Sequence, residues 1–276
     1  MRARASEVGR YSIIASSAIF ALTIIAIGSM GLVDGSFGPI WLPVPEKLVG
    51  RDVLAYLCAL IALSTGVGLL TKRMAGTAAL ALLLYLVVWT VAFKVPFIVR
   101  APLTEVNYES CGENLVLIVA AWSLYVRAAA NTNALARPAA LKVAHALYGL
   151  ALLAFGLSHF FYMQLTAPLV PKWLPAPESW AYLTGAIYAV TGILITTGFY
   201  ARIAAYVVAF QITLITGLVW AAPALSGALG GPTLGEAVIS WALTAGAWVI
   251  VASFELSGTS QPAAASAGMA EIAAAS

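Results

Sequence analysis

Three side chains combine acid–base chemistry with strongly apolar surroundings: Asp34, His159 and Tyr188. Asp34 ends "GLVD" at 31–34 and His159 ends "GLSH" at 156–159, so the two residues occupy equivalent places in similar tetrapeptides. Histidine titrates near neutral pH, and an Asp/His pair can hold a quinone head group or exchange its proton. Tyr188 can donate a hydrogen bond at a similar depth. These three are our candidate ligand-binding residues; a histidine bonded to a neighbouring helix or facing head groups is the structural alternative.

The histidine count also tests for haem and metals. His145 and His159, the only two histidines, are about 21 Å apart if both lie on one helix rising roughly 1.5 Å per residue. Two stacked haems would need two more ligands from another helix, and no further histidine exists. We therefore expect neither haem nor a Cys/His metal site. Catalytic residues are not assigned, and a quinone is the one cofactor that this chemistry suggests.

Two cysteines, Cys58 and Cys111, are predicted near the outer ends of two helices. If those helices are adjacent, the sulfurs can form a disulfide or redox pair in an oxidising compartment. They do not form a Cys-x-x-Cys motif. The alternative is that each is an independent, small apolar residue.

A proline-rich hexapeptide occurs twice, as "WLPVPE" at 41–46 and "WLPAPE" at 173–178. Proline fixes φ and lacks an amide hydrogen, so each copy predicts a stiff turn between helices. Tryptophan suits the membrane interface, and an acidic residue near the next helix N-terminus is favoured by the helix dipole. A lid over a ligand is the alternative. The motif residues are Trp41, Pro43, Pro45, Glu46, Trp173, Pro175, Pro177 and Glu178.

The composition shows which elements must position these residues. Hydrophobic residues make up 62% of the 276 positions and charged residues 9%, far from the usual balance of soluble proteins. Apolar stretches of about 20 residues, long enough to cross a bilayer as helix, recur along the chain. We predict an all-α polytopic integral membrane protein with eight spans, at residues 11–33, 53–70, 74–93, 111–128, 144–164, 180–197, 203–222 and 237–254.

The distribution of charge predicts the topology. With the N-terminus inside, nine of the fourteen basic residues fall on the inner side, which satisfies the positive-inside rule and places both termini in the cytoplasm. Most acidic residues then lie outside, so chemistry is expected at the outer face. We expect a multi-pass protein of the cell membrane with the lipid bilayer as its surroundings, and no nucleic-acid partner, because no basic aromatic surface is present.

Four similar segments recur in the same order, with offsets of 125, 132, 126 and 123 residues. They comprise the tetrapeptides, the hexapeptides, "TGVGLLTKR" with "TGILITTGF", and "CGENLVLIVAAW" with "LGEAVISWALTA". Because a repeat of four spans preserves orientation, the two copies are expected to be parallel repeats. The predicted organisation is a first four-helix unit at 11–126, a cytoplasmic linker at 127–142, a second unit at 143–255 and a disordered tail at 256–276.

The predicted outer loop of the first unit is charged. Lys94 and Arg100 precede Glu105 and Glu109 in the chain, so we expect pairing at the surface. The alternative is an acidic patch that recruits a soluble periplasmic partner. Glu113 and Glu236 occupy equivalent first-turn positions, where the helix dipole explains a carboxylate.

The stretch at 155–206, from "FGLSHFF" through "PKWLPAPE" to "GFYARIAAY", resembles the DoxX and DoxX-like integral membrane proteins. The first half matches less closely but keeps "WLPVPE" and the "TKR" turn at 71–73. The resemblance implies tandem DoxX-like four-helix bundles. This chain departs from the family pattern at one position of each unit. Relatives carry a glutamate in the second helix, where this chain has Ala62 in the first unit and Tyr188 in the second.

The resemblance implies a quinone-linked or redox-accessory membrane subunit that acts at the outer face and that is not expected to be catalytic without a redox or periplasmic protein partner. A transporter or binding protein for small molecules or lipids, using the cleft between the repeats, is the first alternative. A non-catalytic membrane scaffold is the second. Retention of a quinone, substrate flux without electron transfer, or co-purifying partners would distinguish the three.

Overall fold

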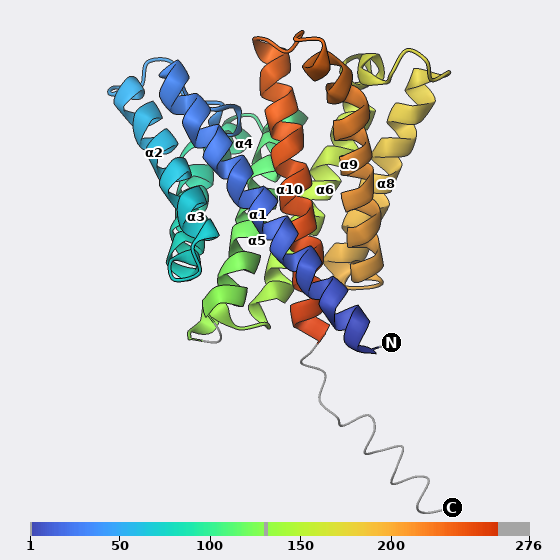
Figure 1. Ribbon diagram of the computed structural model, residues 1–276. Helices are drawn as coiled ribbons and strands as arrows, with labels where there is room; N and C mark the ends of the chain where they lie inside the picture. The colour runs from blue at the N-terminus through green and yellow to red at the C-terminus, as the bar shows by residue number, and fades with distance from the viewer. Residues whose placement is uncertain (1, 130–131, 259–276) are drawn as a thin grey trace, which may run out of the picture.

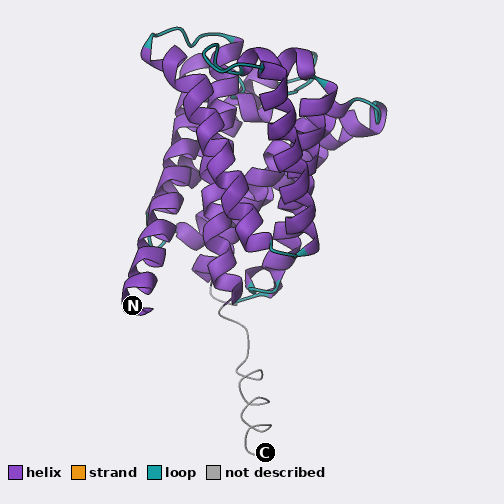
Figure 2. Ribbon diagram, turned by 90° about the vertical axis from the view of Figure 1, so that its right-hand side faces the viewer, coloured by secondary structure: helices purple, strands orange, loops and turns teal. Residues whose placement is uncertain are grey.

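The computed structural model describes residues 2–129 and 132–258, and within these ranges the chain is helical, with no strand (Figure 2). Of the segment at 256–276, residues 256–258 continue the last helix, and the rest lies outside the described residues. The long helices are α1 Arg2–Asp34, α2 Arg51–Leu70, α3 Ala75–Trp89, α5 Glu105–Ala129, α6 Ala140–Phe161, α8 Pro177–Thr197, α9 Ala201–Leu225 and α10 Pro232–Gly258. The short elements are η1 Pro39–Trp41, η2 Thr90–Lys94, α4 Val95–Arg100, η3 Ala134–Ala136, α7 Met163–Thr166 and η4 Ala167–Leu169.

Seven stretches among the described residues are long and apolar enough to cross a membrane, as expected for a polytopic membrane protein. They are Ile13–Asp34, Arg51–Leu70, Ala75–Arg100, Ala140–Phe161, Pro177–Thr197, Ala201–Leu225 and Thr233–Phe254. The predicted span at 111–128 falls within α5, which is not one of the seven. Its polar first turns carry Glu105, Glu109 and Glu113. Eight spans therefore stay a prediction.

The helices form a closed ring of neighbours that is pinched where two of its members touch across the middle. In chain order, α1 packs on α2, α2 on α3, α3 on α5, α5 on α6, α6 on α8, α8 on α9 and α9 on α10, and α10 returns to α1. α5 and α10 also pack against each other across the middle. The start of α1 and the end of α10 lie at the same end of the bundle (Figure 1). We call the opposite end, which holds Asp34, the outer end.

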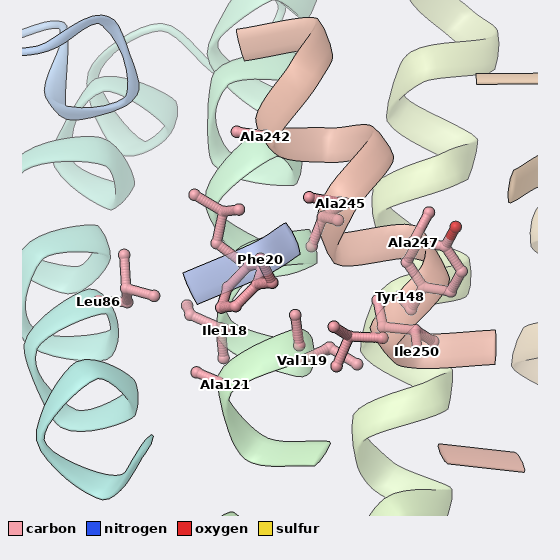
Figure 3. Packing of buried hydrophobic residues seen from close by; sticks show 14 of the residues in the cluster. Phe20, Leu86, Ile118, Val119, Ala121, Tyr148, Ala242, Ala245, Ala247 and Ile250 are labelled. Carbon is pink, nitrogen blue, oxygen red and sulfur yellow. The ribbon is translucent and has the colours of Figure 1, made fainter. Parts of the chain in front are cut away.

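The core lies where α5 and α10 meet the surrounding helices. Figure 3 shows Ile118, Val119 and Ala121 of α5 beside Ala245 and Ile250 of α10. These side chains are almost fully buried. Since lipid is as apolar as a core side chain, small residues at such contacts stabilise a membrane bundle by letting helices approach closely.

Glycines allow two pairs of helices to approach closely toward the outer end. A Cβ at Gly156 of α6 would lie 3.0 Å from the Gly185 carbonyl oxygen of α8. In the first half, a Cβ at Gly31 of α1 would lie 2.9 Å from the Cβ of Ala59 in α2. Because at most a methyl group separates the backbones, residues beside these crossings are held at short range, and His159 is one of them.

The two hexapeptides have different surroundings. Trp41 is 1% exposed and its carbonyl accepts a hydrogen bond from Trp89 Nε1 at 3.0 Å, so the expectation that it anchors at the interface is wrong. Trp173 is 71% exposed. Glu178 lies in the first turn of α8 as expected, whereas Glu46 precedes α2, whose first-turn acid is Asp52. The prolines lie in or beside these helix-entry turns.

Candidate functional site

Two hollows open at the outer end and meet between the halves of the molecule. The first hollow has a volume of about 840 Å³ and is lined by residues of α1, η1, α5 and α10. The second hollow, of about 250 Å³, is lined by residues of α5, α6, α8, α9 and α10. Both are lined by Glu109, Glu113, Glu236 and Ile239. We call the two together the outer chamber.

The second hollow contains two of the predicted residues. His159, in the last turn of α6, and Tyr188 of α8 have ring centroids 5.4 Å apart. His159 Nδ1 lies 2.8 Å from the Phe155 carbonyl oxygen. Since a carbonyl can only accept, Nδ1 carries the hydrogen, which leaves Nε2 as a hydrogen-bond acceptor while the ring is neutral. Such an acceptor suits a hydroxyl group of a ligand.

The rest of the second hollow is apolar and aromatic. Phe155, Leu218 and Leu243 line it together with Trp180 and Trp220. The Trp220 indole donates to Ser240 Oγ at 2.9 Å, and the Trp180 indole donates to the Pro175 carbonyl at 3.0 Å. These bonds fix both rings at the rim. An apolar pocket with a few convergent polar groups is the usual form of a small-molecule site.

Asp34 does not join His159 in one hollow. It is an exposed residue at the end of α1 and lines the first hollow, whereas His159 lines the second. Asp34 and His159 therefore do not form the predicted pair, because they line different hollows. The three glutamates lie between them.

The junction of the two hollows is formed by Glu109, Glu113 and Glu236. This role was missed in the sequence, because surface pairing or the helix dipole explained these carboxylates. Glu109 and Glu113 stand one turn apart on α5, and Glu236 lies in the first turns of α10. Burial raises the pKa of Glu109, the Glu236 carboxylate raises it further, and a hydrogen-bond contact with Ser158 offsets part of this. A carboxyl group with a raised pKa can hold or release a proton closer to neutral pH.

Lys94 lies beneath the first hollow, and the expectation of a surface lysine is wrong. It is 1% exposed, and Nζ donates to Ser110 O and Ser110 Oγ, each at 2.9 Å. Nζ also lies 3.8 Å from a Glu113 oxygen. A buried ammonium group needs such partners, because removing it from water costs roughly several kcal/mol. Lys94 thus supplies positive charge to the glutamate junction.

The π-helical turn η2 explains how Lys94 reaches this place. The turn covers Thr90–Lys94 and continues α3 into α4, so the helix extends to Arg100 where the sequence predicted a loop after residue 93. Asn114 Nδ2 donates to Thr90 Oγ1 at 3.1 Å and ties the turn to α5. Such turns inside helices are frequent at functional sites. The missed signal was the apolar "VPFIV" after Lys94, which continues the candidate span past the lysine to Arg100.

The cysteines do not pair. Both are free thiols. Cys58 is buried in α2, and Cys111 is half-buried in α5, where it lines a hollow separate from the outer chamber. They therefore form neither a disulfide nor a redox pair in this structure. Among the described residues, no group of three or more His, Cys, Asp or Glu side chains is placed to hold a metal ion.

Comparison with protein families matches the second part of the chain. The model of a domain of unknown function (DUF8561) matches residues 148–254, which contain most of α6 and all of α8 and α9. Neither the curated proteins nor the solved structures yield a match. The matched region includes His159, Tyr188, Trp220 and Glu236, but the match covers less than half of the chain.

Proposed function

We propose that the chain is a DoxX-like membrane subunit that binds a quinone or quinol in the outer chamber. The observation that carries the proposal is the second hollow, where His159 and Tyr188 face an apolar, tryptophan-rimmed space that ends at three glutamates. A quinol head has hydroxyl groups for the polar end and a ring for the apolar walls. The tail would leave toward the lipid.

The residues of the chamber support proton exchange with such a ligand. His159 Nε2 can accept a hydrogen bond from a ligand hydroxyl, and the tyrosine hydroxyl can donate to a carbonyl. Glu109, with its raised pKa, can take up or release a proton beside them. Oxidation of a quinol also releases two electrons, and the resemblance to DoxX proteins implies a separate redox partner to receive them.

The same proposal includes two four-helix units, eight spans across the cell membrane and both termini on its cytoplasmic side. The helix contacts support it, because α1–α2–α3–α5 and α6–α8–α9–α10 follow the same order of neighbours. The glycine crossings support it too, since Gly31 and Gly156 stand 125 positions apart, as the tetrapeptides do.

The test is quinone retention by the purified full-length protein in mild detergent, measured by mass spectrometry of extracted lipids. Loss of one neutral hydrogen bond weakens binding by about 1 kcal/mol, so His159→Ala should retain roughly five- to tenfold less quinone. His145→Ala is the matched control, because His145 lies on the same helix but bonds to Ser253 away from the chamber. Absence of quinone from wild type, or equal loss in both variants, would contradict the proposal.

A second candidate is a binding protein or transporter for small molecules that uses the cleft between the repeats. It is favoured by the position of the junction, because Glu109 and Glu113 come from one half and Glu236 from the other. Reconstituted vesicles would then show flux of a substrate without any electron acceptor. Glu236→Gln should lower that flux, and unchanged quinone retention in the same variant would separate the two candidates.

A further inference from the structure

A third hollow lies on the opposite face of α5 from the outer chamber. We call it the lateral groove; it has a volume of about 520 Å³ and runs between α5 and α6 beside the α4–α5 connection. Glu105, Tyr108, Cys111, Gly112 and Leu115 of α5 line it. Their spacing of three, four and seven residues places them on one helix face, whereas Glu109 and Glu113 line the chamber from another. The groove is therefore separate from the site proposed above.

The groove has the dimensions and walls of an acyl-chain site. The lining residues of α6 run from Leu150 to Phe161, eleven helical steps apart, which corresponds to about 16 Å at roughly 1.5 Å per step. One leaflet contributes about half of a hydrocarbon core roughly 30 Å thick, so the groove matches the depth of one leaflet. Apart from Glu105, the wall is formed mainly by apolar residues such as Ile98, Leu115 and Leu153. A lipid chain in the outer leaflet fits it along its whole length.

Glu105 stands at the outer end of this groove and lacks a partner. It is 8% exposed, and neither carboxylate oxygen has a hydrogen-bond partner. A buried carboxylate without donors is costly, and such groups normally have a protein, water or ligand partner. As the first residue of α5, Glu105 lies at the level where a head group would meet the chain that occupies the groove.

We propose that the lateral groove binds an outer-leaflet phospholipid whose head group carries a primary ammonium, with one acyl chain between α5 and α6 and the ammonium on Glu105. A primary ammonium supplies three N–H donors and a positive charge, which matches two unpartnered carboxylate oxygens. A choline head carries the charge without N–H donors, so it lacks the hydrogen bonds. A glycerol head group carries no positive charge, so the phosphate of that lipid leaves it with a net negative charge beside the carboxylate.

The pH dependence follows from the same carboxyl group. Burial raises the pKa of Glu105 to about 7, and the Glu109 carboxylate contributes to the rise. Above that pH the carboxylate is ionised and attracts the ammonium; below it the neutral acid does not. Selection for the ammonium lipid should therefore be strong at pH 8 and weak at pH 5.

The experiment is native mass spectrometry of the full-length protein with added phosphatidylethanolamine, phosphatidylcholine or phosphatidylglycerol of identical acyl chains. We expect at least tenfold tighter retention of phosphatidylethanolamine at pH 8. Glu105→Gln should bring it to the level of phosphatidylcholine, whereas Asp52→Asn, which neutralises an exposed carboxylate at the outer end of α2, should preserve the preference.

Ala154→Phe tests the groove itself, because Ala154 forms part of its wall away from the carboxylate. It should lower retention of all three lipids equally. Equal retention of the three lipids by wild type, a preserved preference in Glu105→Gln, or unaltered binding in Ala154→Phe would each overturn the proposal. These outcomes do not depend on whether the chamber binds quinone.

Discussion

The two hexapeptide turns have nearly the same sequence and opposite environments. Trp41 is enclosed by aromatic rings of α3, with centroids 5.0 Å from Tyr85 and 5.7 Å from Trp89. Trp173 is 71% exposed, and the carbonyl of Pro175 in its turn accepts a bond only from the local Trp180. One turn closes over a packed cluster, whereas the other stands at the rim of the second hollow.

The difference arises in α3 and α9, not in the turns. Counting 126 positions onward from Tyr85, Trp89 and Phe93 of the first half gives Gln211, Ile215 and Val219. Ile215 and Val219 line the second hollow. Smaller side chains thus stand at the positions of α9 that correspond to the cluster of tilted and edge-on rings around α3.

Lys94 and Trp220 differ by the same 126 positions. In the first half Lys94 bonds to Ser110 beneath the glutamates, and in the second half Trp220 bonds to Ser240 at the hollow. The bundle thus has a packed, charge-balancing side around Lys94 and an open, aromatic side around Trp220. We infer that the open side is the ligand side.

The largest expected effect is at the tryptophans. Trp41→Ala removes a fully buried ring and should lower the free energy of unfolding by about 3–5 kcal/mol. Trp173→Ala should change it by about 0.5 kcal/mol or less because the ring is mostly exposed. Denaturant titration of the purified protein in detergent measures both. Similar losses in the two variants would show that the turns are equivalent after all.

Lys94 gives the next effect. Lys94→Met leaves Glu113 without its cation and should cost about 3 kcal/mol, the low end of what breaking a buried pair costs. Lys172→Met, at an exposed lysine next to the other hexapeptide, should be neutral. Adding Glu113→Gln to Lys94→Met should restore part of the loss, which a double-mutant cycle of unfolding free energies detects. If the losses of unfolding free energy in the two single variants simply add, Lys94 acts only through Ser110.

The helical membrane architecture could be predicted from the sequence because apolar runs of about 20 residues identify spans without tertiary information. The similar depth of His159 and Tyr188 could also be predicted, whereas the 5.4 Å between their ring centroids is known only from the structure. The burial of Trp41 was not, because it depends on Tyr85 and Trp89 of another helix. Nor was the π-helical turn at Lys94, whose extra residue per turn leaves no periodic signal in so short a segment.

The smallest effect concerns the crossing that holds His159. A Cβ at Gly185 would lie 2.8 Å from the His159 Cβ and 3.1 Å from the Gly156 carbonyl oxygen, so Gly185→Ala must push α6 and α8 apart. Overpacking of this kind costs about 1–2 kcal/mol. The position 126 residues earlier already carries a methyl group at Ala59, and Ala59→Gly should cost only about 0.5–1 kcal/mol through helix propensity.

Quinone retention distinguishes the two variants further. It should fall in Gly185→Ala, which moves His159 away from Tyr188, and stay at the wild-type level in Ala59→Gly. Loss of quinone in Ala59→Gly alone would assign the ligand to the first hollow.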